Sequence, residues 1–190
     1  ILSLCLMTYI YSKNRAENHI TLRFAYASST KPLQMAFADF GKRLEEKTKG
    51  AISIIYFPDS QLGGERELVE LVQTGAVDIT KVSGGLLESF APLYGVFSLP
   101  YVFDDENHFY KVMDNLEIMK PVYKSTEPIG FLGLTYYDAG QRSFYTKNKP
   151  IIKLEDLNGL KFRVIQSQTA IKMVSLLGGT PVAMSNNETY

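Results

Sequence analysis

Hydrophobic and polar residues along the chain follow two alternating periods. Residues 20–27 (ITLRFAYA) place an apolar side chain at every second position, which is typical of a strand with one buried face. Residues 33–50 instead place Leu33, Phe37, Phe40 and Leu44 on one side of a helix, with SSTKP before it as cap and Gly50 as its end. The chain therefore opens with a strand followed by a helix.

The same order repeats further along the chain. We expect strands over residues 51–58, 76–83 and 129–137, and helices over residues 65–75 and 105–124, with a break at Pro121 as an alternative. Strands separated by helices predict an α/β fold whose sheet is mainly parallel, with helices on both faces. Ligands bind beyond the carboxyl ends of such strands, at the loops of residues 27–31, 57–65 and 82–85.

The pattern changes near residues 138–140 to short strands and turns, with one further helix over residues 169–177. We therefore place a lobe boundary there, which gives residues 1–19 as leader, 20–139 as the first lobe and 140–190 as part of a second. Within the second part, LKFRVIQSQ reads as a strand with Leu160, Phe162 and Val164 on one face, and Ser167 as the cap of the next helix.

Two arginines stand out in this second part. Arg163 lies opposite the apolar face of its strand and close to a helix start, a place suited to an anion. Alternation alone leaves a surface charge and an anion site equally open for Arg163. For Arg142, which follows a glycine and opens a short strand, the surface charge is favoured.

Composition narrows the function classes. The 190 residues include twenty basic and twenty acidic side chains, so no broad basic patch favours nucleic acid or an anionic membrane. The two histidines show no metal spacing, and no P-loop, dinucleotide fingerprint or nucleophile elbow is present. We expect neither a cofactor nor a metal, and no enzymatic activity.

The first twelve residues form an apolar run that is too short to cross a bilayer comfortably. The run fits the core of a secretory signal, and a buried strand or helix is the alternative. It holds Cys5, the only cysteine, and Leu4 disfavours a lipoprotein cleavage site. The remaining sequence offers no disulfide framework or thiolate site.

Four motifs occur in an order that resembles one transporter family. They are FPDSQLGGERELVELVQTGAVDIT, FSLPYVF, LEDLNGLKFRV and LGGTPVAMSNNETY. From about Leu22 to Tyr190 the chain resembles the extracytoplasmic solute-binding subunits of tripartite ATP-independent periplasmic (TRAP) transporters, in the branch for dicarboxylates, sialic acid and other organic acids. The resemblance implies a two-lobe (Venus-flytrap) fold and an N-terminal fragment with its second lobe incomplete.

The resemblance also implies a function. Family members capture a small organic acid in the bacterial periplasm and deliver it to a permease driven by a cation gradient. We accordingly expect a monomeric carrier of a carboxylate solute whose partners are the TRAP permease subunits. The alternative is a ligand-sensing extracytoplasmic module of a signalling protein with the same fold, and an enzyme is the least favoured class.

Seven positions match ligand-binding positions of the family. The resemblance implies that Arg163 forms a salt bridge with the solute carboxylate and that Arg142 is a second arginine of the site. It implies that Glu65 contacts polar groups of the solute or orders its loop. It assigns the pocket lining to Ser28, Ser83, Tyr101 and Gln166. Ala27 lacks the amide of the sialic-acid binders, which disfavours sialic acid.

Overall fold

The computed structural model describes residues 19–28 and 30–189, so residues 1–18 of the leader expected over residues 1–19, with Cys5, lie outside the described residues. The chain divides into two compact units, the first ending at Lys81 and the second beginning at Val82. Each unit is built around its own small parallel sheet.

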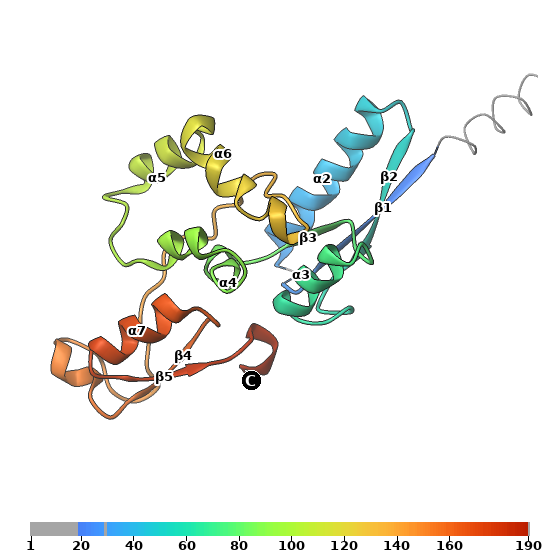
Figure 1. Cartoon of the computed structure of the whole chain (residues 1–190). Coiled ribbons are helices and arrows are strands. Elements are labelled where there is room, and N and C mark those ends of the chain that lie inside the picture. The colour runs from blue at the N-terminus through green and yellow to red at the C-terminus, as the bar shows by residue number, and fades with distance from the viewer. Residues whose placement is uncertain (1–18, 29, 190) are drawn as a thin grey trace, which may run out of the picture. The chain divides into compact units, whose positions relative to one another are not determined.

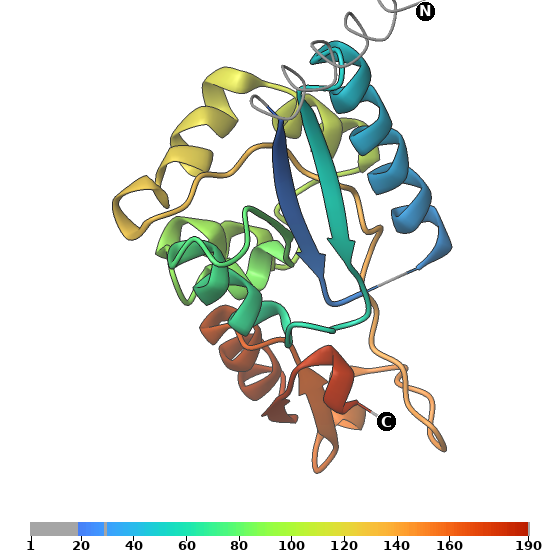
Figure 2. The ribbon, with the colours of Figure 1, turned by 90° about the vertical axis from the view of Figure 1, so that its right-hand side faces the viewer.

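The first unit contains a three-stranded parallel sheet. Its strands are β1 (Ile20–Tyr26), β2 (Ile52–Phe57) and β3 (Ile79–Lys81), in the order β2-β1-β3. Ile20 lies opposite Ile52, and Phe24 lies opposite Ile79. Figure 2 shows β1 and β2 side by side and pointing the same way. All carboxyl ends therefore meet at one edge, as the sequence predicts.

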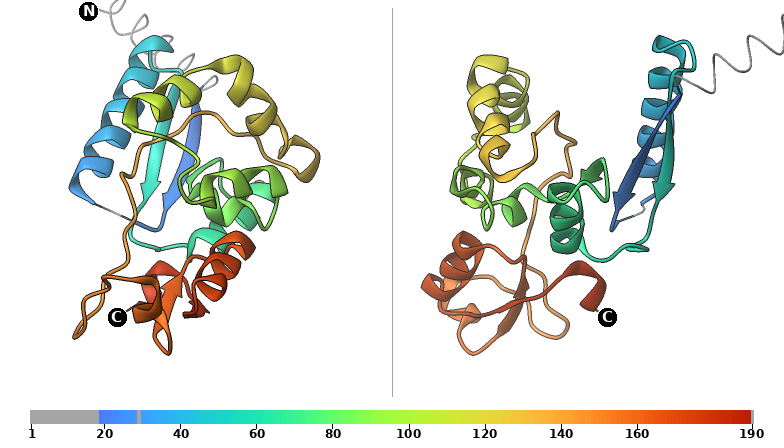
Figure 3. Two further views of the ribbon diagram at one scale, coloured as in Figure 1. Left: turned by 90° about the vertical axis from the view of Figure 1, so that its left-hand side faces the viewer. Right: turned by 45° about the vertical axis from the view of Figure 1, so that its right-hand side comes forward.

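Successive side chains of β1 point to opposite faces of the sheet, and a helix packs against each face. On one face, Phe37 of α2 (Lys31–Lys47) packs between Phe24 and Tyr26, with ring centroids 4.7 Å from each. Figure 3 shows α2 running beside the strands. On the other face, Leu68 of α3 (Glu65–Gln73) packs with Ala25 in the core. The α/β architecture is confirmed.

The second unit contains a two-stranded parallel sheet of β4 (Lys161–Val164) and β5 (Thr180–Ala183). Helix α7 (Gln168–Leu176) lies over this pair and buries Val174 against Phe162 and Val164 (Figure 1). The other helical segments are α4 (Gly84–Leu87), η1 (Pro92–Ser98), α5 (Glu106–Met113), α6 (Leu116–Lys124), η2 (Glu127–Ile129), η3 (Leu154–Leu157) and η4 (Asn186–Glu188).

The helix expected over residues 105–124 is two helices, and its break does not lie at Pro121. The chain leaves α5 at Asp114, and Asn115 caps α6 by accepting a hydrogen bond from the Glu117 N–H at 3.0 Å. An asparagine cap satisfies N–H groups that a new helix leaves free, whereas Pro121 removes only one N–H group inside α6. The cap therefore outweighs the proline in setting the break.

The strand expected over residues 129–137 is also wrong. Ile129 ends η2 and Gly130 has a left-handed φ of 94°, and residues 131–137 pair with no other strand among the described residues. Gly133 instead donates its N–H to the backbone oxygen of Tyr123 at 3.0 Å. A Cβ on Gly133 would lie 2.7 Å from the Tyr94 hydroxyl, so the glycine permits this close packing. The backbone is thus bonded to the end of α6 in place of a sheet. The short strands expected between residues 140 and 151 are likewise absent from the described chain.

The division at Lys81 differs from the lobe boundary that the sequence places at residues 139 and 140. Leu86 of α4 packs into one cluster with Val164 and Ile165, so residues before and after 139 share a core in the second unit. The predicted lobe limits concern the two lobes of a whole binding protein, and they stay a prediction.

Candidate functional site

Strand β4 separates its apolar and charged side chains as the sequence predicts. Phe162 and Val164 are buried, while Lys161 and Arg163 are exposed on the opposite face. The Arg163 Nε–H donates a hydrogen bond to the backbone oxygen of Met184 at 2.9 Å. No other hydrogen bond or ion pair of Arg163 is seen among the described residues, so its two terminal amino groups can receive an anion.

A tight turn joins β4 to α7 and carries Gln166. The Ser167 N–H donates to the Ile165 oxygen at 2.7 Å, which places Gln166 at the centre of a three-residue turn. Ile165 and Ser167 are 9% and 1% exposed, so both neighbours of the partly exposed Gln166 are fixed in the core. The Ser167 hydroxyl accepts from the Ala170 N–H at 3.1 Å, which confirms the predicted helix cap.

An acidic residue that the sequence reasoning missed lies at the start of α7. The Glu88 carboxylate accepts hydrogen bonds from the Ser167 hydroxyl and from the Thr169 hydroxyl, the latter at 2.7 Å. Burial by itself raises the pKa of Glu88, but these bonds and that of the Thr169 N–H outweigh it and lower the pKa. Because 79 residues separate Glu88 from Ser167, no local spacing could have revealed the contact.

Arg142 lies on an exposed segment, and no hydrogen bond or ion pair holds it within the described part of the chain. The residues before it are anchored by two tyrosine–aspartate pairs. The Tyr110 hydroxyl donates to Asp138 at 2.8 Å, and the Tyr136 hydroxyl donates to Asp114 at 2.7 Å. The backbone segment that precedes Arg142 is therefore held against α5 and its C-cap residue Asp114, while Arg142 itself is exposed.

Two of the expected pocket-lining residues of the second unit differ in their surroundings. Tyr101 is 98% exposed and has a φ of 56°, which is uncommon for a residue other than glycine. Ser83 is partly buried at the start of α4, where its backbone oxygen accepts from the Leu86 N–H at 2.9 Å. The structure thus places Ser83 in ordered structure and leaves the Tyr101 side chain in solvent.

Ser28 and Glu65 lie at the carboxyl edge of the first sheet. The loop after β2 reaches the loop after β1 there, because the Ser60 hydroxyl donates to the Ala27 oxygen at 3.3 Å. Glu65 begins α3 and forms an ion pair with Lys81 at the end of β3, with 3.3 Å between Nζ and Oε1. Both side chains are mostly buried, and sequence reasoning missed Lys81. The edge therefore carries a matched pair of charges.

The predicted site residues thus fall in both units. Ser28 and Glu65 belong to the first unit. Arg163 and Gln166 share one short segment of the second unit, where the structure brings them together on β4 and the turn that follows. Ser83, Tyr101 and Arg142 come from three other segments of that unit. The assignment of these seven residues to one ligand stays a prediction.

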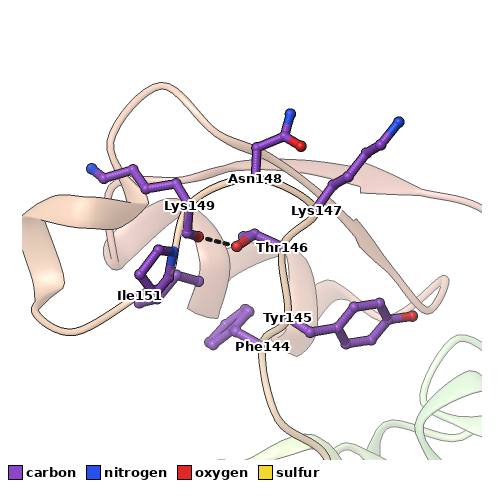
Figure 4. Close-up of a pocket in the computed structure, with 8 residues that line it drawn as sticks. Phe144, Tyr145, Thr146, Lys147, Asn148, Lys149 and Ile151 are labelled. Carbon is purple, nitrogen blue, oxygen red and sulfur yellow. Dashed lines mark hydrogen bonds between the residues drawn. The ribbon is translucent and has the colours of Figure 1, made fainter.

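A small pocket lies elsewhere, in a single loop of the second unit. Residues 144–151 enclose about 360 Å³, and the Thr146 hydroxyl donates to the Lys149 oxygen across the loop (Figure 4). Figure 4 shows the side chains of Lys147 and Lys149 pointing away from it. None of the seven predicted residues lines this pocket, so it is not the site that the sequence indicates.

Within residues 19–28 and 30–189, no three side chains of His, Cys, Asp or Glu are grouped so that they could hold a metal ion. No helix in the same ranges has the length and apolar character needed to cross a membrane.

Comparison with known proteins gives concordant results. Uncharacterized protein YiiZ of Salmonella typhimurium is 57% identical over 169 residues, which are 89% of this chain and 52% of YiiZ. A TRAP periplasmic solute-binding protein of Anaerococcus prevotii, solved with bound α/β-D-glucuronate, superposes with a TM-score of 0.87 at 40% identity. One from Xanthobacter autotrophicus, with bound β-D-galacturonate, gives 0.81 at 38% identity.

The coverage of these matches is uneven. The two structural matches cover 90% and 86% of this chain, but only 56% and 55% of the solved chains. The chain therefore spans about half the length of the relatives that it matches. Residues 24–190 match the model of the bacterial extracellular solute-binding proteins, family 7 (DctP), and the chain belongs to this family.

Proposed function

We propose that this protein captures a small organic acid in the periplasm and delivers it to a TRAP permease driven by a cation gradient. The observation that carries the proposal is Arg163, which is exposed on β4 and held through Nε by the Met184 oxygen. The function is one of binding and release, without turnover of the solute. Membership of the solute-binding family supports it.

The geometry of Arg163 suits a carboxylate. With Nε bonded to the protein, the guanidinium keeps its two terminal amino groups, and this end of the fork matches the two oxygens of a carboxylate. Each charge-assisted hydrogen bond contributes about 1.5–3 kcal/mol once water is excluded, more than an exposed ion pair. Arg163 is therefore the proposed anchor for the carboxylate of the solute.

We further propose that the solute is a sugar acid. The relatives from Anaerococcus prevotii and Xanthobacter autotrophicus were solved with hexuronates, which carry one carboxylate and several hydroxyl groups. One anchoring arginine, with the neutral Gln166 on the turn that follows its strand, fits that distribution of charge. The exposed Arg142 would supply the second cation that a dicarboxylate needs.

The test is a binding measurement on the full-length protein. D-glucuronate, D-galacturonate and succinate are titrated by calorimetry into the wild type, Arg163→Ala and Lys161→Ala. Lys161 is the matched control because it is an exposed cation on the same face of the same strand. We expect Arg163→Ala to abolish measurable hexuronate binding and Lys161→Ala to leave it unchanged.

The possible outcomes separate the parts of the proposal. Equal affinity of Arg163→Ala and the wild type would show that the anchor is wrong. Succinate bound more tightly than both hexuronates would replace the sugar acid with a dicarboxylate. Turnover of the bound acid by the purified wild type would contradict a role in binding alone.

A further inference from the structure

The start of α7 is an anion site that the protein fills with its own side chain. The first N–H groups of a helix have no partner within the helix and favour negative charge. Here the Thr169 N–H points to the Glu88 carboxylate, with 3.2 Å to Oε1, and the Thr169 hydroxyl donates to the same oxygen. The Ser167 hydroxyl donates to Oε2. Both carboxylate oxygens are thus bonded to α7.

Two glycines permit this contact. A Cβ on Gly95 would lie 3.2 Å from the Glu88 carboxyl carbon, so a larger residue there would crowd the carboxylate. A Cβ on Gly85 would lie 2.6 Å from the Ser98 hydroxyl, which itself lies 3.2 Å from the Ser167 hydroxyl. The polypeptide from α4 to η1 therefore fits closely around the beginning of α7.

The contact bears on the proposed site through the turn between β4 and α7. Ser167 is 1% exposed and bonds to Glu88, and its N–H closes the turn that has Gln166 at its centre. Arg163 lies only three residues before Gln166, on the strand that leads into this turn. A displacement of Ser167 would therefore move Gln166 directly and Arg163 through β4.

We propose that Glu88 is a positioning residue for solute binding, which holds the start of α7 and with it the turn that presents Gln166 beside Arg163. The inference rests on the proposed function. Since Glu88 already occupies the N-terminus of α7, that helix end is not open to the solute carboxylate, which is left to Arg163.

Three variants of the full-length protein test the inference. Glu88→Ala removes the carboxylate, and Glu88→Gln keeps its shape without the charge. Val122→Ala is the control, because Val122 is a buried residue of α6, in the same unit, that is remote in sequence from the turn. The affinity for D-glucuronate and the melting temperature without ligand are measured for each variant.

We expect Glu88→Ala to weaken glucuronate binding about tenfold or more, since three hydrogen bonds to a charged group are lost. Glu88→Gln should weaken binding less. Val122→Ala should lower the melting temperature and leave the affinity unchanged. Formate, which can enter the space left by the carboxylate, should restore part of the glucuronate affinity of Glu88→Ala. In the wild type, formate should only compete with glucuronate at Arg163.

The outcomes distinguish this inference from the proposed function. Wild-type affinity in both Glu88 variants would overturn the positioning role while leaving the proposed function intact. A wild type that binds none of the tested acids would overturn both. If Glu88→Ala does not fold, Glu88→Gln and Thr169→Val, which removes one donor at constant shape, carry the same test. Unchanged affinity in those two variants would then overturn the inference.

Discussion

The Nε atom of Arg163 lies 2.9 Å from the backbone oxygen of Met184, so this guanidinium is bonded across the sheet before any solute arrives. Met184 directly follows β5, and its own N–H donates to the Val164 oxygen at 3.1 Å. One residue therefore both continues the pairing of β4 with β5 and orients the arginine. Orientation in advance reduces the side-chain entropy that binding would otherwise cost.

Arg163→Lys should lower the affinity for a carboxylate solute by about tenfold to a hundredfold, because one bidentate charge-assisted contact is lost. A single ammonium group cannot bond to the Met184 oxygen and present a two-pronged donor at the same time. Calorimetric titration with D-glucuronate measures the loss, and Lys161→Arg on the same face of β4 is the control. Equal affinity of Arg163→Lys and the wild type would exclude bidentate anchoring.

The Tyr136 hydroxyl should lose its proton only in strong alkali. Burial and the hydrogen bond to Asp114 raise the pKa of Tyr136 to about 12, above its usual value near 10. A raised pKa in the folded state means a contribution to stability that is complete below the unfolded pKa and is lost as pH rises through the folded pKa. This contribution should therefore decline between about pH 10 and pH 12.

The measurement is a difference titration of phenolate absorbance between the wild type and Tyr136→Phe. The difference should show one group that titrates near pH 12, and the variant should lack the alkaline part of the stability loss. A difference spectrum that titrates near pH 10 would show that the Tyr136–Asp114 bond is absent in solution.

Local patterns predicted the elements whose signals lie within a few residues. The alternation along residues 20–27 predicted β1 and the face that carries Phe24 and Tyr26, and the serine cap of α7 was predicted directly from Ser167. The break before α6 was missed because the segment holds two residues that can end or begin a helix, Asn115 and Pro121. The helix begins at the Asn115 cap, and Pro121 lies inside it. Residues 129–137 have the composition of a strand, but composition cannot say whether a partner strand is present.

The candidate site shows the same division. Within LKFRVIQSQ, periodicity placed Arg163 opposite the apolar face and the family motif assigned binding roles to Arg163 and Gln166, and these roles stay a prediction. Glu88 and Lys81 were missed, because their partners lie far away in the sequence. Only folding brings Glu88 to Thr169 and Lys81 to Glu65. Long-range pairs of this kind follow from the packing of whole elements, which no short motif encodes.

Asp78 should make the first unit sensitive to acid. The hydrogen bonds from the Arg23 side chain and N–H lower the pKa of Asp78. A lowered folded pKa gives a contribution to stability that is present above the unfolded pKa and disappears as pH falls through the folded pKa. Asp78→Asn should therefore be less stable than the wild type at pH 7, and the difference should shrink toward pH 3.

Urea unfolding of both proteins at several pH values between 3 and 7 checks this (approximately the range in which carboxylates titrate). The double variant Arg23→Ala, Asp78→Asn is the control, because the second substitution should add little once the guanidinium is absent. A stability difference that does not change with pH would mean that the ion pair does not persist in solution.

The aromatic cluster under α2 should dominate the stability of the first unit. Phe37 is 0% exposed and its ring centroid lies 4.7 Å from both Phe24 and Tyr26, so Phe37→Ala should cost about 3–5 kcal/mol. Phe40, one turn along the same helix, is 36% exposed and 6.5 Å from Phe24. Phe40→Ala should cost only about 1 kcal/mol, because less apolar surface returns to water. Urea unfolding of the two variants gives both free energies, and equal losses would show that α2 does not pack through Phe37.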